Sequence, residues 1–179
     1  PEAADDALSA AFRDGLRSSH DHVATEALAR RIFVRGYRFG RSDDARRDEE
    51  LVLPLLDRIS DDGRLRGEYL NNMGAVALGA GEWARAEALL VQAITAKTAA
   101  FGPDSGELVY TLANLGTLRN DRDRTGAAIE SLAAALRVGA AAFGAEHPTV
   151  LLVRGNLGLA LLKIGRAHVL TPVTLRYLV

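Results

Sequence analysis

The chain has 179 residues, 48% of them apolar and 6% aromatic, with a formal net charge of −1 and no cysteine. This charge gives no electrostatic reason to expect nucleic acid, and the lack of cysteine excludes a disulfide framework and thiol chemistry. No apolar run approaches the roughly 18 residues of a membrane span, and no signal peptide is visible, so we expect no membrane partner and a cytoplasmic location. The chain starts at Pro1 rather than methionine, which suggests a fragment, and all basic residues but Lys97 and Lys163 are arginine, which suggests a GC-rich bacterial genome.

Residues 1–64 predict a helical lead-in, made of one helix and one repeat-like hairpin. The first helix is expected over 2–17, where apolar side chains recur at helical spacing. Their stripe consists of Leu8, Phe12 and Leu16. A hairpin follows, with its turn at Gly40, and Pro54 inside its second helix leaves a kink and an early break both open. The hairpin helices are expected over residues 22–39 and 43–59.

The stretch 67–104 then repeats with a shift of 42 residues, and a fixed period of this size is typical of a solenoid. Each unit predicts two amphipathic helices, with small residues where two helix backbones approach closely. We expect an array over 65–163, with repeats near 65–106 and 107–148 and a partial repeat at 149–163. The positions interpreted as structural are Asn72, Gly74, Trp83, Ala86, Asn114, Gly116, Ala128, Asn156 and Gly158.

These units resemble the tetratricopeptide repeat, in the longer form found in kinesin light chains. The likeness rests on Met73-Gly74, Gly81, Trp83, Ala86, Leu90, Ala93, their partners 42 residues on, and the turns at 101–104 and 143–148. The resemblance implies an all-α fold, a right-handed α-solenoid of tetratricopeptide helix hairpins whose concave surface binds a protein or peptide without a cofactor. In the second unit Asp123 replaces the turn glycine and Thr125 the aromatic, so we expect this unit to be softer.

Residues 164–179 are interpreted as a non-native tail. The segment 164–174 closely resembles one translated frame of a common short-read sequencing adapter, and it contains a proline and a β-branched run that disfavour a helix. Gly165 keeps phase with the turn glycine Gly81, so the phase predicts a turn there. The third unit would then lack its second helix.

No catalytic or metal-binding constellation is visible, and we expect no enzymatic activity in this chain. His20 and His22 could suggest a metal site, but residues two apart in a helix point to different sides, and we favour a solvated cap or loop. The acidic residues at 43–44 and 48–50 are interleaved with arginines and are interpreted as a charged helix face. Gly79-Ala80-Gly81 is interpreted as a helix–helix turn rather than a phosphate-binding loop.

Seven arginines lie between Arg30 and Arg47, and three of them share one helical face. These three are Arg31, Arg35 and Arg38. One hypothesis is a basic patch for an acidic peptide or a phosphate. The other, which we favour, is a solvent-exposed face balanced by the acidic run that follows.

The phase of the array predicts which side chains line the concave groove. The predicted peptide-binding positions are Arg30, Tyr37, Arg38, Glu68, Asn71, Leu78, Tyr110, Thr117 and Asn120, joined in the same phase by Val34, Ala75, Ala113, Leu152, Gly155 and Leu159. The recurring Asn72, Asn114 and Asn156 are interpreted as structural, holding neighbouring units together by hydrogen bonds. We also expect Gly116 to lie where the first repeat packs on the second.

The sequence therefore predicts a protein-interaction module, part of a larger bacterial signalling protein. Segments 28–59 and 70–83 look like the repeat regions that follow the catalytic domain in large bacterial serine/threonine protein kinases. No kinase motif lies in this chain, so the kinase domain would lie upstream. The alternative is a scaffold attached to a transcriptional regulator or ATPase; the ligand and the oligomeric state stay open.

Overall fold

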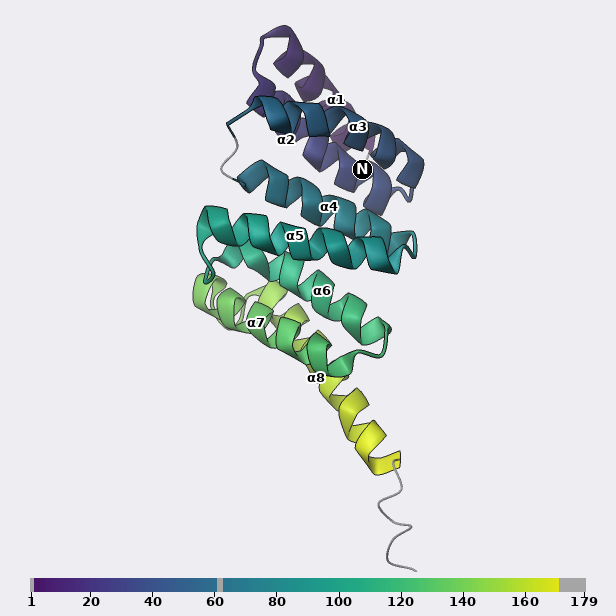
Figure 1. The fold of residues 1–179 in the computed structure, drawn as a ribbon. Coiled ribbons are helices and arrows are strands. Elements are labelled where there is room, and N and C mark those ends of the chain that lie inside the picture. The colour runs from purple at the N-terminus through teal and green to yellow at the C-terminus, as the bar shows by residue number, and fades with distance from the viewer. Residues whose placement is uncertain (1, 61–62, 171–179) are drawn as a thin grey trace, which may run out of the picture. The chain divides into compact units, whose positions relative to one another are not determined.

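The structure, a computed structural model, describes residues 2–60 and 63–170, with side-chain surroundings up to residue 165. In these ranges every element is a helix (Figure 1). The elements are α1 (Glu2–Arg17), α2 (Asp21–Ile32), the π-helical turn η1 (Phe33–Arg38), α3 (Ser42–Arg58), α4 (Arg64–Gly79), α5 (Trp83–Phe101), the short 3₁₀ helix η2 (Gly106–Leu108), α6 (Val109–Asp121), α7 (Thr125–Phe143) and α8 (Pro148–Leu170). Their contacts group into two compact units, Pro1–Thr111 and Leu112–Val179, which we describe in turn.

In the first unit, helices joined by short turns pack side by side, α1 on α2, α2 on α3 and α4, and α4 on α5. The apolar stripes of these helices form one core. Its fully enclosed large side chains are Leu28, Ile32, Val52, Leu56 and Met73. The predicted lead-in helix corresponds to α1 and the predicted hairpin to α2, η1 and α3. Helix α3 continues through Pro54 to Arg58, so the proline causes no early break.

The end of the predicted helix 22–39 differs from an α-helix, because its last six residues form the π-helical turn η1. Gly36 in this turn is buried between two neighbouring helices. A Cβ atom at Gly36 would lie 2.4 Å from Val76 Cγ2 and 2.8 Å from Ala45 Cβ, so only glycine fits. The next turn has Gly40 at φ 67°, close to the φ of 74° at Gly81. The lead-in hairpin therefore turns in the same left-handed conformation as the first regular repeat.

Gly74 and Gly116 occupy equivalent places in successive hairpins, as the 42-residue period predicts. A Cβ at Gly74 would lie 2.9 Å from Leu90 Cγ and 3.6 Å from the Ala86 carbonyl oxygen. At Gly116 the corresponding distances to Leu132 and Ala128 are 2.6 and 3.3 Å. Each glycine thus packs against the second helix of its own hairpin. The expectation that Gly116 lies where one repeat packs on the next is wrong in this respect.

The turns between repeats also recur with the period. Gly102 has φ 84° and ψ 162°, and Gly144 has φ 88° and ψ 154°, a conformation that only glycine adopts readily. Within the second unit, Asp123 takes φ 58° where the first repeat has a glycine. A left-handed aspartate costs more than glycine, which is the physical basis for expecting a softer turn.

In the second unit α7 packs against α8, while Gly116 of α6 packs against Leu132 of α7. Helix α8 continues through Gly165 to Leu170, so the turn predicted at Gly165 is absent. Among the described residues no atom lies within 4 Å of a Cβ built at Gly165 or Gly158, so no described helix packs there and forces the chain to turn, and helical hydrogen bonds continue. Of the predicted tail, residues 171–179 lie outside the described residues.

Two described helices meet the length and hydropathy of a membrane span, which corrects the expectation that no such run exists. They are Thr125–Phe143, with mean hydropathy 1.3, and Pro148–Gly165, with 1.2. This is weak evidence for a membrane, because alanine- and leucine-rich helices of packed hairpins have the same composition. Helix α7 buries one stripe, as such a helix does. The stripe includes Ala128, Leu132, Ala135 and Val138.

We predict that Gly116→Leu lowers the free energy of unfolding by about 1–3 kcal/mol, because the new side chain would overlap Leu132. Urea denaturation followed by circular dichroism measures the change. Gly126→Leu on α7 is the matched control. It should leave stability unchanged or raise it by up to about 1 kcal/mol, because its Cβ has open space and leucine favours the helix. If both variants lost the same free energy of unfolding, Gly116 would not be a packed position equivalent to Gly74 of the first hairpin.

Candidate functional site

The first unit brings predicted groove positions from two helices together on one surface. We call this surface the α2–α4 face. It consists of Arg30, Val34, Tyr37 and Arg38 from α2 and η1, and Glu68, Asn71 and Leu78 from α4. The predicted groove residue Ala75 is instead buried, with 3% exposure. Arg30 Nε lies 3.3 Å from Glu68 Oε1, an ion pair that joins the two helices directly. Arg30 also pairs with Glu26 on its own helix, at 2.7 Å.

An aromatic stack and an arginine stand at the η1 end of the face. The Tyr37 ring is stacked on Phe33 with a centroid distance of 5.1 Å, and Tyr37 is 50% exposed. The Arg38 guanidinium lies 5.9 Å from the Phe33 ring centre, within cation–π range. This end therefore presents a supported aromatic ring beside a positive charge.

The middle of the face is polar and partly enclosed. Burial raises the pKa of Glu68, and the charge of Arg30 and its hydrogen bond partly offset that rise. Asn71 Nδ2 donates to Asn72 Oδ1 at 3.3 Å, while Asn71 Oδ1 is buried with no hydrogen-bond partner among the described residues. This acceptor oxygen therefore lies below the surface of the face, out of reach of solvent.

Two of the repeated asparagines, Asn72 and Asn156, make hydrogen bonds to helices of the preceding repeat-like hairpin. Asn72 Nδ2 donates to the Ala29 carbonyl oxygen of α2 at 3.0 Å, and Asn156 Nδ2 donates to Thr117 Oγ1 of α6 at 3.4 Å. Asn114 lies half-buried on α6. Both bonds join neighbouring units, which is the structural role predicted for these asparagines.

The remaining groove positions lie on α6 and α8. Tyr110, near the start of α6, is 56% exposed. Thr117 accepts the hydrogen bond from Asn156, and the Asn120 carbonyl oxygen accepts one from Lys163 Nζ at 2.7 Å. Lys163 also pairs with Asp123 at 2.7 Å, and its hydrogen bond and charge lower the pKa of that carboxyl. On α8, Leu152 and Leu159 are exposed and Gly155 is open.

The positions predicted to be structural differ in how far they are buried. Ala86 and Ala128 are fully buried, as close-packed positions require. Trp83 instead is 39% exposed at the start of α5, with its ring 3.8 Å from a Cβ built at the turn residue Gly81. It therefore lies over the turn and does not fill a gap in the core.

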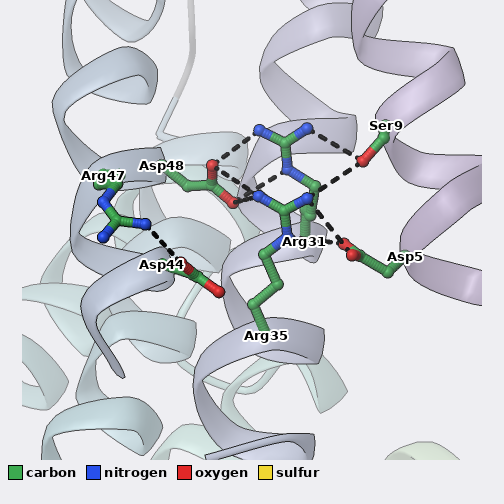
Figure 2. A network of polar contacts seen from close by, with 7 residues as sticks. All are labelled: Asp5, Ser9, Arg31, Arg35, Asp44, Arg47 and Asp48. Carbon is green, nitrogen blue, oxygen red and sulfur yellow. Dashed lines mark hydrogen bonds and ion pairs between the residues drawn. The ribbon is translucent and has the colours of Figure 1, made fainter. Parts of the chain in front are cut away.

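The arginine stripe is mostly internal, so neither hypothesis for it holds for Arg31 and Arg35 (Figure 2). Arg31 forms a two-pronged ion pair with Asp48, with Nη2–Oδ1 2.7 Å and Nε–Oδ2 2.9 Å, and the two residues are only 7% and 2% exposed. Arg35 pairs with Asp5 at 2.7 Å and with Asp48 at 3.4 Å. Both arginines donate to Ser9 Oγ. Of the three arginines on the stripe, only Arg38 is available at the surface.

The sequence held a signal for this buried network. Asp48 stands on the apolar stripe of α3, with Ala45 three positions before it and Val52 four after it. A carboxylate at such a position is buried and needs a cationic partner. The preceding helix offers Arg31 and Arg35, one turn apart.

Some acidic residues of α3 bind side chains of other helices, so the prediction of a charged, solvent-exposed face holds only for the others. Glu49 accepts a hydrogen bond from the Tyr69 hydroxyl at 2.8 Å and pairs with Arg85 at 2.6 Å. Burial raises the pKa of Tyr69, and its hydrogen bond to Glu49 acts in the same direction. Asp44 and Arg47 form an exposed pair at 2.7 Å. Within the described part of the chain no group of three acidic or histidine side chains could hold a metal ion.

Asp48→Asn should lower the free energy of unfolding by about 3–5 kcal/mol, because it leaves two buried or half-buried guanidinium groups without their shared carboxylate. Thermal or urea unfolding measures the loss. Asp44→Asn on the same helix is the control, and it should cost less than about 1 kcal/mol because its pair with Arg47 is exposed. An Asp48 variant as stable as the control would show that the network does not hold the lead-in together.

The raised pKa of Glu68 predicts a pH dependence of stability. The folded state holds this proton more tightly than the unfolded state, so folding gains stability as pH falls through the folded pKa towards the unfolded value of about 4.3. Wild type should therefore gain stability relative to Glu68→Gln between pH 7 and that value. Urea midpoints across the range measure the difference. Glu26→Gln, which removes the other carboxylate on Arg30, is the control; a flat difference for Glu68→Gln would contradict the prediction.

Comparison with known proteins identifies the repeated part of the chain. Residues 65–138 match the family model of the tetratricopeptide repeat, and a search of the curated proteins finds no match to the chain. The matched segment contains α4, α5, α6 and most of α7, which carry the equivalent glycine contacts at Gly74 and Gly116. Residues 65–138 are therefore similar to tetratricopeptide repeats, and the described residues form an all-α fold of helix hairpins.

Proposed function

We propose that the chain is a protein-interaction module that binds a peptide or a partner protein on the α2–α4 face. Tetratricopeptide repeats generally mediate protein–protein interactions. The observation that carries the proposal is the direct contact between Arg30 and Glu68. Two positions that the repeat phase assigns to the ligand-facing side of different helices contact each other, which supports a shared surface on α2 and α4.

The chemistry of the face suits an extended polypeptide. Tyr37 offers an exposed ring held in place by Phe33, and Arg38 offers a charge beside it, the residue types that dominate binding energy at protein interfaces. The Arg30–Glu68 pair, half-exposed at its arginine end, presents charges of both signs.

We further propose that the chain binds neither nucleic acid nor membrane, works in the cytoplasm, and forms a right-handed solenoid. The net charge of −1 supports the proposal that the chain does not bind nucleic acid. The internal ion pairs of Arg31 and Arg35 support it too, because they remove two cations from the surface. The absence of cysteine is compatible with a reducing compartment. The handedness rests on the family resemblance alone.

The parent protein is proposed to be a bacterial signalling protein, with a serine/threonine kinase domain preceding these repeats. Its support is the resemblance of segments 28–59 and 70–83 to the repeat regions of such kinases. A scaffold attached to a transcriptional regulator or ATPase is the alternative. The upstream gene sequence separates them, because a protein kinase carries its catalytic aspartate in an HRD motif and its metal-binding aspartate in a DFG motif, which an ATPase lacks.

The binding proposal is tested with peptides selected on the whole chain from a library of random peptides, then synthesised and titrated by calorimetry. Tyr37→Ala and Arg38→Ala should each weaken binding at least about tenfold, a loss of about 1.4 kcal/mol. Arg47→Ala, an exposed arginine on α3, is the matched control and should bind like wild type. Binding that the two substitutions leave unchanged would place the ligand elsewhere and overturn the proposal.

A further inference from the structure

The η1 end of the α2–α4 face carries a positive charge that no carboxylate of the described residues offsets. Segment 30–38 contains four arginines. Three of them form ion pairs with carboxylates of the first unit, namely Arg30, Arg31 and Arg35. The fourth, Arg38, is exposed, and among the described residues its guanidinium contacts the ring of Phe33 and no carboxylate. The face is therefore balanced in charge at Arg30 and positive at Arg38.

The π-helical turn η1 determines where this charge lies. The Phe39 backbone N–H donates to the Val34 carbonyl oxygen, five positions earlier, at 3.1 Å. In this wider turn the residues four and five positions after Phe33 both lie against its ring. Tyr37 stacks on the ring at 5.1 Å, and the Arg38 guanidinium lies 5.9 Å from its centre. One ring therefore supports an exposed aromatic side chain and an exposed cation together.

The backbone of the turn is also held in place. Gly36 lies between Val76 of α4 and Ala45 of α3, so closely that a Cβ atom would overlap both side chains. Tyr37 and Arg38 follow directly, so they extend from a backbone that close packing fixes. Side chains that are ordered before a ligand arrives lose less conformational entropy on binding. This end of the face is therefore suited to hold one defined position of a ligand.

We propose that the partner polypeptide presents an aspartate or glutamate beside an apolar residue, with the carboxylate on Arg38 and the apolar side chain on Tyr37. This inference rests on the proposed function and names the chemistry of its ligand. A guanidinium group binds a carboxylate through two parallel N–H···O hydrogen bonds. Among the described residues no carboxylate competes for Arg38, so the ligand would supply the missing partner.

The number of available charges favours a carboxylate over a phosphate. A phosphorylated side chain carries about two negative charges at neutral pH and is recognised by clustered arginines. The other arginines of segment 30–38 are bound to carboxylates of the chain itself, so one positive charge remains for the ligand. A single positive charge matches the single negative charge of an aspartate or glutamate.

Peptides selected on the whole chain from the random library test the inference, and their sequences should be enriched in acidic residues beside apolar ones. In the tightest binder, replacing the acidic residue with its amide should weaken binding to wild type at least about tenfold, measured by calorimetry. The same replacement should change binding to Arg38→Gln less than about twofold, because the partner of the carboxylate is already absent. Arg41→Gln is the matched control and should keep the full sensitivity. Arg41 is also exposed and lies 5.0 Å from an aromatic ring, that of Phe39, but it is outside the face.

A charge exchange gives a second measurement. Arg38→Glu should bind the same peptide with lysine at its acidic position more tightly than wild type does. Circular dichroism should show both Arg38 variants to be folded, because Arg38 has no ion pair with a described residue to lose.

Peptides that lose affinity for Tyr37→Ala but show no acidic preference would overturn this inference and leave the proposed function standing. Binding that Tyr37→Ala leaves unchanged would overturn both. A peptide with phosphoserine at the acidic position that binds more than about tenfold tighter than the acidic peptide would assign Arg38 to a phosphate instead.

Discussion

The regular repeats depend on one contact, a leucine of the second helix set against a glycine of the first. At Gly74 and Gly116 this contact leaves too little space for even one additional carbon atom. It brings the two backbones of the hairpin close enough for the carbonyl oxygen of a small residue, Ala86 or Ala128, to approach the glycine. Close approach of this kind maximises dispersion contacts between helices that contain few large side chains.

The lead-in solves the same packing problem differently. Its core combines a tightly enclosed glycine, Gly36, with an ion-pair network that joins α1, η1, α2 and α3. The π-helical turn lets Arg35 reach Asp5 and Asp48 while Tyr37 and Arg38 remain at the surface. A buried network of this type is poor at adding stability compared with apolar packing, but every member restricts where its neighbours lie. The α2–α4 face thus rests on a rigid, specifically oriented support.

The sequence was sufficient to predict the helices and the repeat register, because glycine, alanine and leucine recur at fixed spacing and packing fixes their roles. The match of residues 65–138 to the tetratricopeptide repeat and the equivalent contacts of Gly74 and Gly116 confirm this. The buried pair of Arg31 and Asp48 differs from the predicted charged face because Asp48 stands on the apolar stripe of α3, a position that charge alone does not reveal. Helix α8 continues past the turn predicted at Gly165, because a glycine ends a helix only where the packing requires a turn. The ligand-facing positions follow from the phase and stay predictions.

The register within the first hairpin constrains how the chain can vary in length. Gly67 and Gly74 of α4 face Lys97 and Leu90 of α5, so the two contacts run in opposite orders along the two helices. An inserted or deleted residue in the turn at Ala80 and Gly81 would displace both contacts at once. The connection after Gly102 contains no such pair of linked contacts among those described. Natural length variation should therefore accumulate between hairpins, while the tip of each hairpin keeps its size.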